Sequence, residues 1–500
     1  MEQLETQVLI VGAGTTGAAI AREISKYKID AILVDADEDI AMGETKASHG
    51  MIYGGGLTAA LSLILKSVMT EDGKSAYDPN SRKIKMEHAA IRDFPPLAEE
   101  LDITLTHDTR LLIAKNEDDI EKLKVAERIV NEMGAELTWI DKEELIDLFP
   151  NLTKDAICGV SDPSHQYTVY PWEWAIGLVE NAKQNGVKLM VRAEVLSIKP
   201  LDGGFIVETT RGPIRTEFVI NAAGPYADRV AQMAGVCDFG LKFARSQMLI
   251  LDKRLDYLGD KPIAVGLAPL PGRTRSLRLT PSGNIQTICS QYYPVEDPED
   301  TSTLSEWYTD SISGAKEIIP AISERDIITS YTGVRVFNDR DPDQDIIEAS
   351  KGNPRFINAV IGLPGVTVTP AMARYIMELL GDQGLAMVEK TDFNPRRKAI
   401  PKVSELSDEE VNRLIAQDTR YGNVVCRCEL VTEGEIVEAI RRGARTISAV
   451  KYRTRGHMGR CQGNFCRPRI LEILARELSV PLSKVSKYGS GSEEVLFNSL

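Results

Sequence analysis

Two groups of residues at opposite ends of this 500-residue chain have the types and spacing of cofactor-binding residues. Toward the C-terminus, four of the seven cysteines form the pattern C-x-C … C-x4-C, at Cys426, Cys428, Cys461 and Cys466. Near the N-terminus, the segment V-L-I-V-G-A-G-T-T-G contains G-x-G-x-x-G, at Gly12, Gly14 and Gly17. A dinucleotide at one end and a metal centre held by thiolates at the other would together form a path for electrons.

The three glycines have distinct roles if they bind a dinucleotide. Gly12 permits the tight turn after a strand, and Gly14 removes a side chain that would block the pyrophosphate. Gly17 lets the following helix pack closely on the strand, so that the helix N-terminus faces the phosphates. The glycine pattern alone is weak evidence, and its value depends on the elements around it.

Those elements have the expected order. Residues 6–11 form a short apolar run that predicts a buried parallel strand, and residues 15–26 carry an apolar stripe typical of a helix. Residues 31–34 predict the next strand, which ends at Asp35. A carboxylate at that position would accept hydrogen bonds from ribose hydroxyls and would repel a 2′-phosphate. The sequence therefore predicts a β-α-β unit that binds a dinucleotide.

Four cysteine thiolates suit either a [2Fe–2S] cluster or a structural zinc ion. Zinc sites usually pair their cysteines as C-x2–4-C, so the C-x-C spacing favours the cluster and leaves zinc as the alternative. In a reducing compartment we expect metal ligation rather than disulfides. The isolated cysteines are interpreted as buried free thiols, at Cys158, Cys237 and Cys289.

The remaining pattern predicts an α/β chain of more than one domain. Residues 82–150 look largely helical, with helices at 118–133 and 142–149 and a strand pair around 101–114. Strands are expected at 189–198, 205–209, 217–221 and 357–361, and helices at 370–380, 407–417 and 432–442. Alternating apolar and polar residues with turn residues predict an antiparallel sheet covering a substrate site at about 240–335.

We assign three domain limits from this pattern. Residues 1–385 form a nucleotide-binding unit in which a Rossmann-like part and an antiparallel-sheet substrate part interleave. Residues 386–419 are a linker, marked by the basic, proline-containing segment N-P-R-R-K. Residues 420–490 form a small α-rich domain that contains the four cysteines.

Composition excludes some classes of function. A net charge of −14 and a pI of about 5.1 argue against nucleic-acid binding. The acidic N-terminus has no signal-peptide pattern, and no run of about 18 apolar residues predicts a membrane span. We expect a cytoplasmic protein, with any membrane contact peripheral and made through a partner.

Three further segments resemble FAD-dependent oxidoreductases of the D-amino-acid-oxidase superfamily, and the resemblance covers roughly residues 5–480. They are G-E-T-K-A-S-H-G at 43–50, V-I-N-A-A-G-P-Y-A-D at 219–228 and I-G-L-P-G-V-T-V-T-P at 361–370. In that superfamily such loops contact the flavin, so FAD is expected rather than NAD. The implied cofactor contacts are Thr45, Lys46, Ser48, His49, Gly50, Val195, Ala223, Gly224, Gly362, Gly365, Val366 and Thr367.

The C-terminal segment resembles the bacterioferritin-associated-ferredoxin-like [2Fe–2S] domain. The matching stretches are C-R-C-E-L-V-T-E-G-E-I and R-T-R-G-H-M-G-R-C-Q-G-N-F-C. In particular, it resembles the version fused to the large subunit of anaerobic-type glycerol-3-phosphate dehydrogenases. The arginines of residues 453–461 are expected beside the cluster, where positive charge would raise its reduction potential.

The resemblance also suggests catalytic residues. In Y-T-G-V-R, at 331–335, Arg335 matches the family arginine that points at the substrate above the flavin, and its alternative is an ion pair with Asp339 or Asp341. His49 would either assist removal of a hydroxyl proton or hydrogen-bond the flavin. A phosphate pocket could be built from Arg245, Arg273, Arg275 and Arg278.

Together these features predict an FAD-dependent dehydrogenase of a small anionic hydroxy compound. The favoured substrate is glycerol 3-phosphate, which would be oxidised to dihydroxyacetone phosphate. Electrons would leave through the [2Fe–2S] cluster to a partner, either a second flavoprotein or a quinone-linked protein, within an oligomer or hetero-complex. A 2-hydroxy acid such as 2-hydroxyglutarate, an amino acid or an opine is the alternative substrate. A redox- or iron-sensing scaffold is the non-enzymatic alternative.

Overall fold

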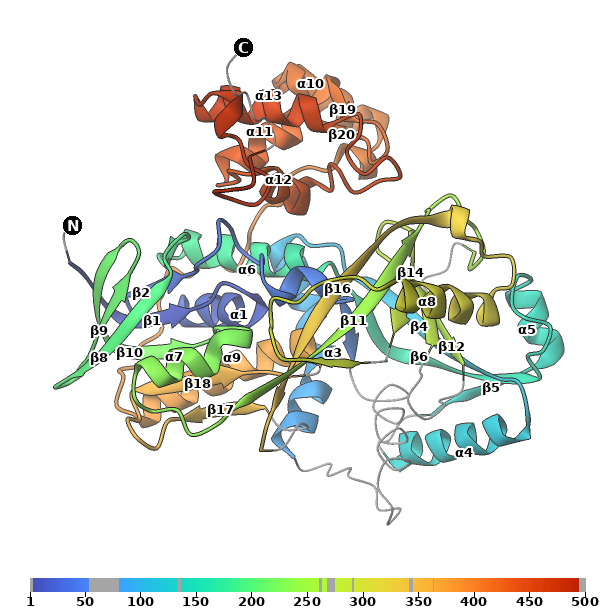
Figure 1. The fold of residues 1–500 in the computed structure, drawn as a ribbon, viewed down its shortest axis with the longest axis horizontal. Helices are drawn as coiled ribbons and strands as arrows, with labels where there is room; N and C mark the ends of the chain where they lie inside the picture. Colours follow the sequence, from blue (N-terminus) through green and yellow to red (C-terminus); the bar gives the residue numbers. More distant parts are fainter. Residues whose placement is uncertain are drawn as a thin grey trace.

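The fold was obtained as a computed structural model that describes residues 3–53, 81–132, 136–259, 263–267, 275–289, 292–340, 345–362 and 364–493. Two large sheets lie side by side, and the C-terminal helical region lies across them (Figure 1). The same chain segments alternate between the two sheets, so neither sheet is built from one continuous stretch of sequence.

The first sheet has β1 (Leu4–Val11) near its middle, in the order β17-β18-β10-β1-β2-β7. Neighbours from β18 to β7 run parallel, while β17 is antiparallel. Residues 8–10 are fully buried because both faces of the sheet are covered, as a continuous apolar run requires. The other strands are β2 (Ala31–Val34), β7 (Lys188–Met190), β10 (Gly212–Asn221), β17 (Ile346–Ala349) and β18 (Phe356–Val360).

Helices cover one face of this sheet and form the largest core. Ala18 and Ile20 of α1 pack with Trp174 of α6 and Ile376 of α9. The opposite face is covered by α7 and by a β-hairpin, which contribute a second core. These elements are α1 (Thr15–Ile24), α3 (Arg82–Leu101), α6 (Pro171–Gln184), α7 (Ala227–Met233), α9 (Gly365–Asp382) and the hairpin β8 (Val195–Leu201) to β9 (Gly204–Thr209).

The second sheet is antiparallel except where β12 runs parallel to β4. Its longest pairing joins β11 to β16, with Ala244 opposite Arg335 and Gln247 opposite Thr332. Its strands are β3 (Met51–Tyr53), β4 (Thr106–Ala114), β5 (Thr138–Asp141), β6 (Cys158–Thr168), β11 (Leu241–Leu251), β12 (Ile263–Leu267), β13 (Arg275–Leu279), β14 (Ile285–Cys289), β15 (Tyr293–Val295) and β16 (Ile327–Asn338). Its flanking helices are α4 (Glu117–Glu132), α5 (Lys142–Leu148) and α8 (Ser305–Ile318).

The C-terminal region is a small helical unit with a core of its own. Ile436, Val450, Ile470 and Leu474 are buried together with Cys426 and Cys466. Its elements are α10 (Asp408–Gln417), β19 (Val424–Cys426), β20 (Val431–Thr432), α11 (Glu433–Arg441), α12 (Ile447–Thr454) and α13 (Arg467–Leu478). In Figure 1 it is the orange and red unit, and α12 faces α6.

The segment that leads into the C-terminal unit is hydrogen-bonded to α6 and to the end of α3. The carbonyl of Asn394 accepts hydrogen bonds from the side chains of Asn181 and Asn185. Arg397 donates to Glu180 at 2.6 Å and to the Leu101 carbonyl at 2.7 Å. We refer to residues 390–400 as the strap. They run along α6 and the end of α3 just before the C-terminal unit begins.

The predicted fold class is confirmed, with a Rossmann-like part, an antiparallel-sheet part and a small α-rich C-terminal part. Two local expectations were wrong. The strand pair around 101–114 is one strand, β4, and its partners are β6 and β12. The strand at 189–198 is divided into β7 and β8, because Arg192 adopts a left-handed conformation with φ 54°.

No helix within the described ranges is long and apolar enough to cross a bilayer. The domain limits at 385 and 419 stay a prediction.

Candidate functional site

The glycine loop follows β1 and adopts a shape that larger residues would not permit. Gly12 has φ +104°, and a Cβ there would lie 2.3 Å from the Ala222 carbonyl oxygen. A Cβ on Gly17 would lie 1.8 Å from the Gly12 carbonyl oxygen. These two glycines therefore fix the close approach of β1, α1 and the segment after β10.

Gly14 differs from Gly12 and Gly17 because any residue could adopt its backbone conformation. It is the N-cap of α1 with φ −70°, and a Cβ there would meet only the Thr45 hydroxyl, at 3.1 Å. Thr45 in turn accepts a hydrogen bond from the Thr15 N–H at 2.9 Å. Space is thus kept open at the start of α1, as a pyrophosphate on a helix N-terminus requires.

Asp35 lies beside this loop, at the end of β2. Its carboxylate accepts the N–H groups of Ala13 at 2.5 Å and of Asp37 at 2.8 Å. Burial, and then the charge of Asp37, raise the pKa of Asp35 to about 6. The Asp35 carbonyl accepts the Ala193 N–H, and Val195 follows with its side chain in the core. The carboxylate is therefore held in place at the loop edge.

The other predicted FAD contacts follow neighbouring strands of the same sheet. Ala223 and Gly224 follow β10, and the segment from Gly362 through Gly365, Val366 and Thr367 follows β18 and begins α9. Because β18, β10, β1 and β2 are adjacent and parallel, their carboxyl ends meet at one edge. The structure thus brings these segments together at the place where such sheets bind nucleotides.

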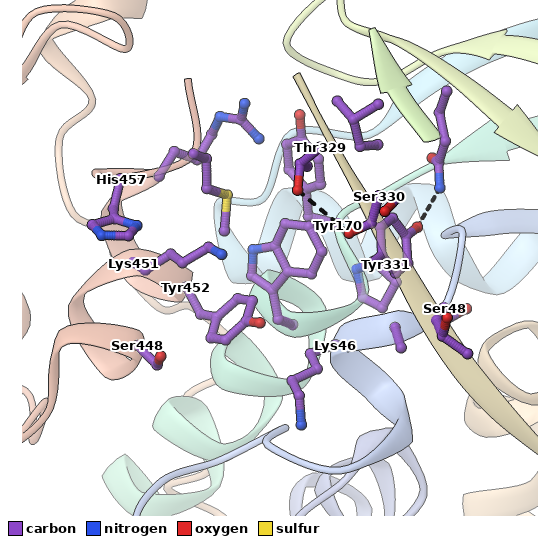
Figure 2. Close-up of a pocket in the computed structure, with 18 of the residues that line it drawn as sticks. Lys46, Ser48, Tyr170, Thr329, Ser330, Tyr331, Ser448, Lys451, Tyr452 and His457 are labelled. Atoms are coloured by element: carbon purple, nitrogen blue, oxygen red, sulfur yellow. Dashed lines mark hydrogen bonds between the residues drawn. The ribbon is translucent and has the colours of Figure 1, made fainter. Parts of the chain in front are cut away.

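A cavity of about 610 Å³ adjoins this edge (Figure 2). One wall is the Gly43–Gly50 loop, with Lys46, Ser48 and His49. A second wall is formed by β16, at 329–332, together with Arg278 and Gln286. The start of α6, at 170–172, also lines the cavity. A further wall comes from the C-terminal unit, through Ser448, Lys451, Tyr452, Arg455, His457, Met458, Gln462, Arg467, Lys487 and Tyr488.

His49 is a neutral imidazole in this wall. Burial lowers its pKa well below the usual value, and the cations Arg278, Arg335 and Arg110 lower it further. Its Nδ1 accepts the Met51 N–H at 3.1 Å, so the ring proton is assigned to Nε2. His49 therefore offers a hydrogen-bond donor through Nε2. Gly50, with φ +75°, makes the turn that follows.

Arg335 is buried behind the Gly43–Gly50 loop and is not among the residues that line the cavity. Its Nη1 lies 3.5 Å from Glu44 Oε2, and its Nη2 donates to the Ala47 carbonyl at 3.3 Å. Burial raises the pKa of Glu44 to about 7, although Arg335 acts to lower it. Asp339, the expected alternative partner, binds the Gly240 N–H instead, and Asp341 lies outside the described residues.

Of the four arginines proposed for a phosphate pocket, Arg278 reaches the cavity. It is buried, donates to Gln286 at 2.6 Å and to the Thr168 hydroxyl at 3.0 Å, and also contacts the His49 carbonyl. Arg245 lies elsewhere, bound to Asp300 and to Ser302. Arg273 and the side chain of Arg275 lie outside the described residues.

The four cysteines come together as two pairs. Cys426 hydrogen-bonds Cys466, which lowers the pKa of Cys426, and Cys428 contacts Cys461. In the described part of the chain, no three His, Cys, Asp or Glu side chains are grouped to hold one metal ion. In a [2Fe–2S] cluster, each of these pairs would hold one iron through two sulfurs.

Glycines shape the cradle around these thiols. A Cβ on Gly459 would lie 2.3 Å from Cys428 Cβ, and one on Gly463 would lie 2.0 Å from the His457 ring. The segment from Gly459 to Gly463, just before Cys466, therefore packs closely against Cys428 and His457. Cys158 and Cys237, outside this cradle, are free thiols and are only partly buried, and the Cys289 side chain lies outside the described residues.

Arginines that follow one another near the cysteines contact the FAD-binding part of the chain, so they join the C-terminal unit to it. Arg453 forms an ion pair with Asp39, and both side chains are at most 5% exposed. Arg460 binds Asp252 at 2.8 Å. Arg455 stacks over Tyr170, with its guanidinium carbon 4.8 Å from the ring centre.

Sequence reasoning missed the lining residues of α12, Lys451 and Tyr452. Tyr452 packs on Trp172, with ring centres 5.4 Å apart, and Lys451 projects into the cavity (Figure 2). The K-Y-R-T-R segment carries no chemical motif, and its role depends on a contact between units far apart in sequence. No local pattern could have revealed it.

Family models match both parts of the chain. The FAD dependent oxidoreductase family matches residues 7–379, and the BFD-like [2Fe-2S] binding domain matches residues 424–476. The chain is 34% identical over 492 residues to a glycerol 3-phosphate dehydrogenase of Caloramator mitchellensis, with 97% of each chain covered. It is 25% identical to a subunit of the anaerobic glycerol-3-phosphate dehydrogenase of Escherichia coli K12, covering 94% of this chain and 88% of that protein.

A solved structure has the same fold. L-alpha-glycerophosphate oxidase of Mycoplasma pneumoniae, with FAD bound, superposes with a TM-score of 0.69 at 22% identity. The match covers 79% of this chain and 99% of the oxidase. The chain therefore belongs to the FAD-dependent oxidoreductase family, and it carries a BFD-like [2Fe–2S] binding domain at its carboxyl end.

Proposed function

We propose that this enzyme oxidises glycerol 3-phosphate to dihydroxyacetone phosphate and passes the electrons out through its [2Fe–2S] domain. The near full-length similarity to proteins named glycerol 3-phosphate dehydrogenase supports the substrate. Bound FAD would accept hydride from the C–H next to the secondary hydroxyl, and the cluster would carry electrons away one at a time.

The observation that carries this proposal is the position of the cavity. It is bounded on one side by the Gly43–Gly50 loop, proposed to contact the flavin, and on the other by the domain that holds the four cysteines. Its described lining contains the cations Lys46, Arg278, Lys451, Arg455, Arg467 and Lys487 and one carboxylate, Glu44. A small anion is the substrate that such a lining favours.

Three residues of the chain would prepare this site. His49, whose Nε2 carries the proton, would donate a hydrogen bond to the flavin or the substrate oxygen, which supports the hydrogen-bonding role over proton removal. Arg335 and Glu44 would hold the loop that presents His49, since Arg335 binds both Glu44 and the Ala47 carbonyl. In this geometry Arg335 acts from behind the loop.

A partner protein would receive the electrons. Several relatives of this chain are named as one subunit of an anaerobic glycerol-3-phosphate dehydrogenase, which implies at least one further chain in those enzymes. We infer an acceptor of the second-flavoprotein or quinone-linked kind, through which this cytoplasmic chain would reach a membrane. An added electron-transfer domain has no use if O2 takes electrons directly from the flavin.

The test is an anaerobic reaction of the as-purified enzyme with glycerol 3-phosphate, followed by visible absorption and by EPR of the frozen product. Bleaching of the flavin together with a reduced [2Fe–2S] signal is expected. Bleaching by 2-hydroxyglutarate or an amino acid, but not by glycerol 3-phosphate, would overturn the substrate and keep the electron path. Bleaching without any cluster signal, in a preparation whose cluster dithionite reduces, would overturn the path.

A further inference from the structure

The cluster-bearing domain contributes a positively charged wall to the cavity, and Lys451 is its central group. Lys451 lies on α12, and Figure 2 shows its ammonium group directed into the cavity between Tyr452 and His457. Lys46, on the Gly43–Gly50 loop, is also a lining residue and lies below Tyr452 in the same view. A ligand in the cavity would therefore meet cations supplied by both domains.

Most other cations of the lining already have partners. Arg455 binds Glu429 at 3.0 Å and stacks over Tyr170. Arg278 is held by Thr168 and Gln286. Lys46 is attracted by Asp37, Glu44 and Asp35.

Lys451 is different because like charges surround it. No carboxylate in the described part of the chain lies within ion-pair distance of it, and its ring contact is with Tyr452. Burial, and then the charges of Lys487, Arg455 and Lys46, lower the pKa of Lys451 to about 8. A bound anion would relieve this repulsion, whereas an uncharged ligand would not.

The position of Lys451 is fixed by its neighbours on α12. Tyr452 packs on Trp172, and Arg453 is buried against Asp39. Thr446 caps the helix by accepting the Ala449 N–H. Lys451 therefore stands on an element that is bound to the FAD-binding part, which is what a positioned ligand-binding residue needs.

We propose that Lys451, assisted by Lys487, binds the phosphate of the substrate, so that the [2Fe–2S] domain completes the substrate site as well as carrying electrons. The identity of the substrate rests on the proposed function, but the anion site does not. Lys487 lies in the same wall and would contribute a second positive charge. The oxidation site is then complete only when the C-terminal domain is docked.

The experiment compares full-length holoenzymes carrying Lys451→Gln, Lys451→Arg and Lys484→Gln. Lys484 is an exposed lysine of the same domain outside the cavity, and it serves as the matched control. Flavin and iron contents are measured first. Inorganic phosphate binding is then titrated by calorimetry and by the flavin spectrum, and KM and kcat are measured with glycerol 3-phosphate and an artificial acceptor.

We expect K451Q to weaken phosphate binding and raise KM for glycerol 3-phosphate by at least tenfold, with smaller changes in kcat. K451R should recover most of the binding because it keeps the charge, and K484Q should match the wild type. Equal phosphate affinity in K451Q and wild type, or no saturable phosphate binding by either, would overturn the proposal. So would loss of FAD from K451Q without weaker phosphate binding.

Failure of this proposal is distinguishable from failure of the proposed function. If glycerol 3-phosphate reduces the wild-type flavin and K451Q behaves like the wild type, the function stands and the anion site falls. If phosphate binding depends on Lys451 but glycerol 3-phosphate does not reduce the flavin, the anion site stands and another anionic substrate must be sought.

Discussion

At the scale of single residues, the three glycines of the loop are not equivalent. Gly12 and Gly17 are required by the packing of the protein itself, since a Cβ on either would overlap a carbonyl oxygen. Gly14 has an ordinary φ and free space around its Cα, apart from the Thr45 hydroxyl. We therefore propose that the space at Gly14 serves the cofactor rather than the fold.

Substitution should separate these two roles. Gly14→Ala should fold with a melting temperature near that of the wild-type apoprotein but retain little FAD. Gly17→Ala should lose more than about 3 kcal/mol of stability, because its Cβ would overlap backbone. Flavin-to-protein ratio and thermal unfolding of both variants provide the check. Full FAD retention in Gly14→Ala would contradict the assignment of that space to the pyrophosphate.

At the scale of elements, α11 shows how far a local pattern can be trusted. Thr432 accepts the Glu435 N–H at 3.4 Å, and Glu435 accepts the Thr432 N–H at 2.8 Å, which is the capping box that T-E-G-E predicts. The sequence did not show that Glu435 would be buried. Burial raises the pKa of Glu435 to about 7, although its hydrogen bonds with Thr432 act to lower it.

This raised pKa makes domain stability depend on pH. The folded state holds the Glu435 proton more tightly than the unfolded state, so its contribution is full below pH 4.5 and is lost as pH rises through 7. The loss amounts to roughly 3 kcal/mol. Glu435→Gln keeps an acceptor for the Thr432 N–H without the titration.

Melting of the C-terminal domain, followed by the cluster's visible circular dichroism, measures this effect. Glu435→Gln should melt above the wild type at pH 8, and the gap should shrink toward pH 5. A gap that stays constant across that range would show that the buried carboxyl does not titrate there.

Elements with strong local patterns were the predictable ones. The run that forms β1 and the apolar stripe of α1 were found because each pattern follows from burial on known faces. The helix α6 was missed because its apolar residues, including Trp174, surround it on several sides and leave no stripe. The division of β7 from β8 depends on one left-handed residue, Arg192, which propensity does not predict.

At the scale of the whole molecule, the docking of the C-terminal domain determines what the site contains. Glycines and cysteines could be found from sequence because each set has a fixed local spacing. Lys451 could not, because its role follows from the packing of α12 on α6. Arg335 was found by resemblance, yet the structure places it behind the loop with Glu44, a partner 291 positions away that no spacing indicates.

Arg453 and Asp39 form a buried ion pair between the C-terminal domain and the FAD-binding part. Arg453→Met leaves Asp39 buried without its partner and should cost about 3–5 kcal/mol at the interface. Hydrogen exchange should rise in α12 and at the start of α6. The double variant Asp39→Asn with Arg453→Met should recover much of the loss, because no uncompensated charge remains.

A matched control is Arg469→Met, which removes a half-exposed arginine of the same domain that faces Glu472. It should leave exchange in α12 and α6 unchanged. Unchanged exchange in Arg453→Met as well would show that the other contacts between the units, such as Arg460 with Asp252 and Tyr452 on Trp172, hold the domain without this pair.

The strap has a consequence for how electrons travel. Arg397 ties the strap to Glu180 and to the Leu101 carbonyl, and Arg453 ties the C-terminal domain itself to Asp39, so both are bound to the FAD-binding part. Under the proposed electron path, this attachment would hold the glycine loop and the four sulfurs at one separation, and transfer from flavin to cluster would need no domain movement. Its rate would be set by tunnelling distance, and solvent viscosity would leave it unchanged.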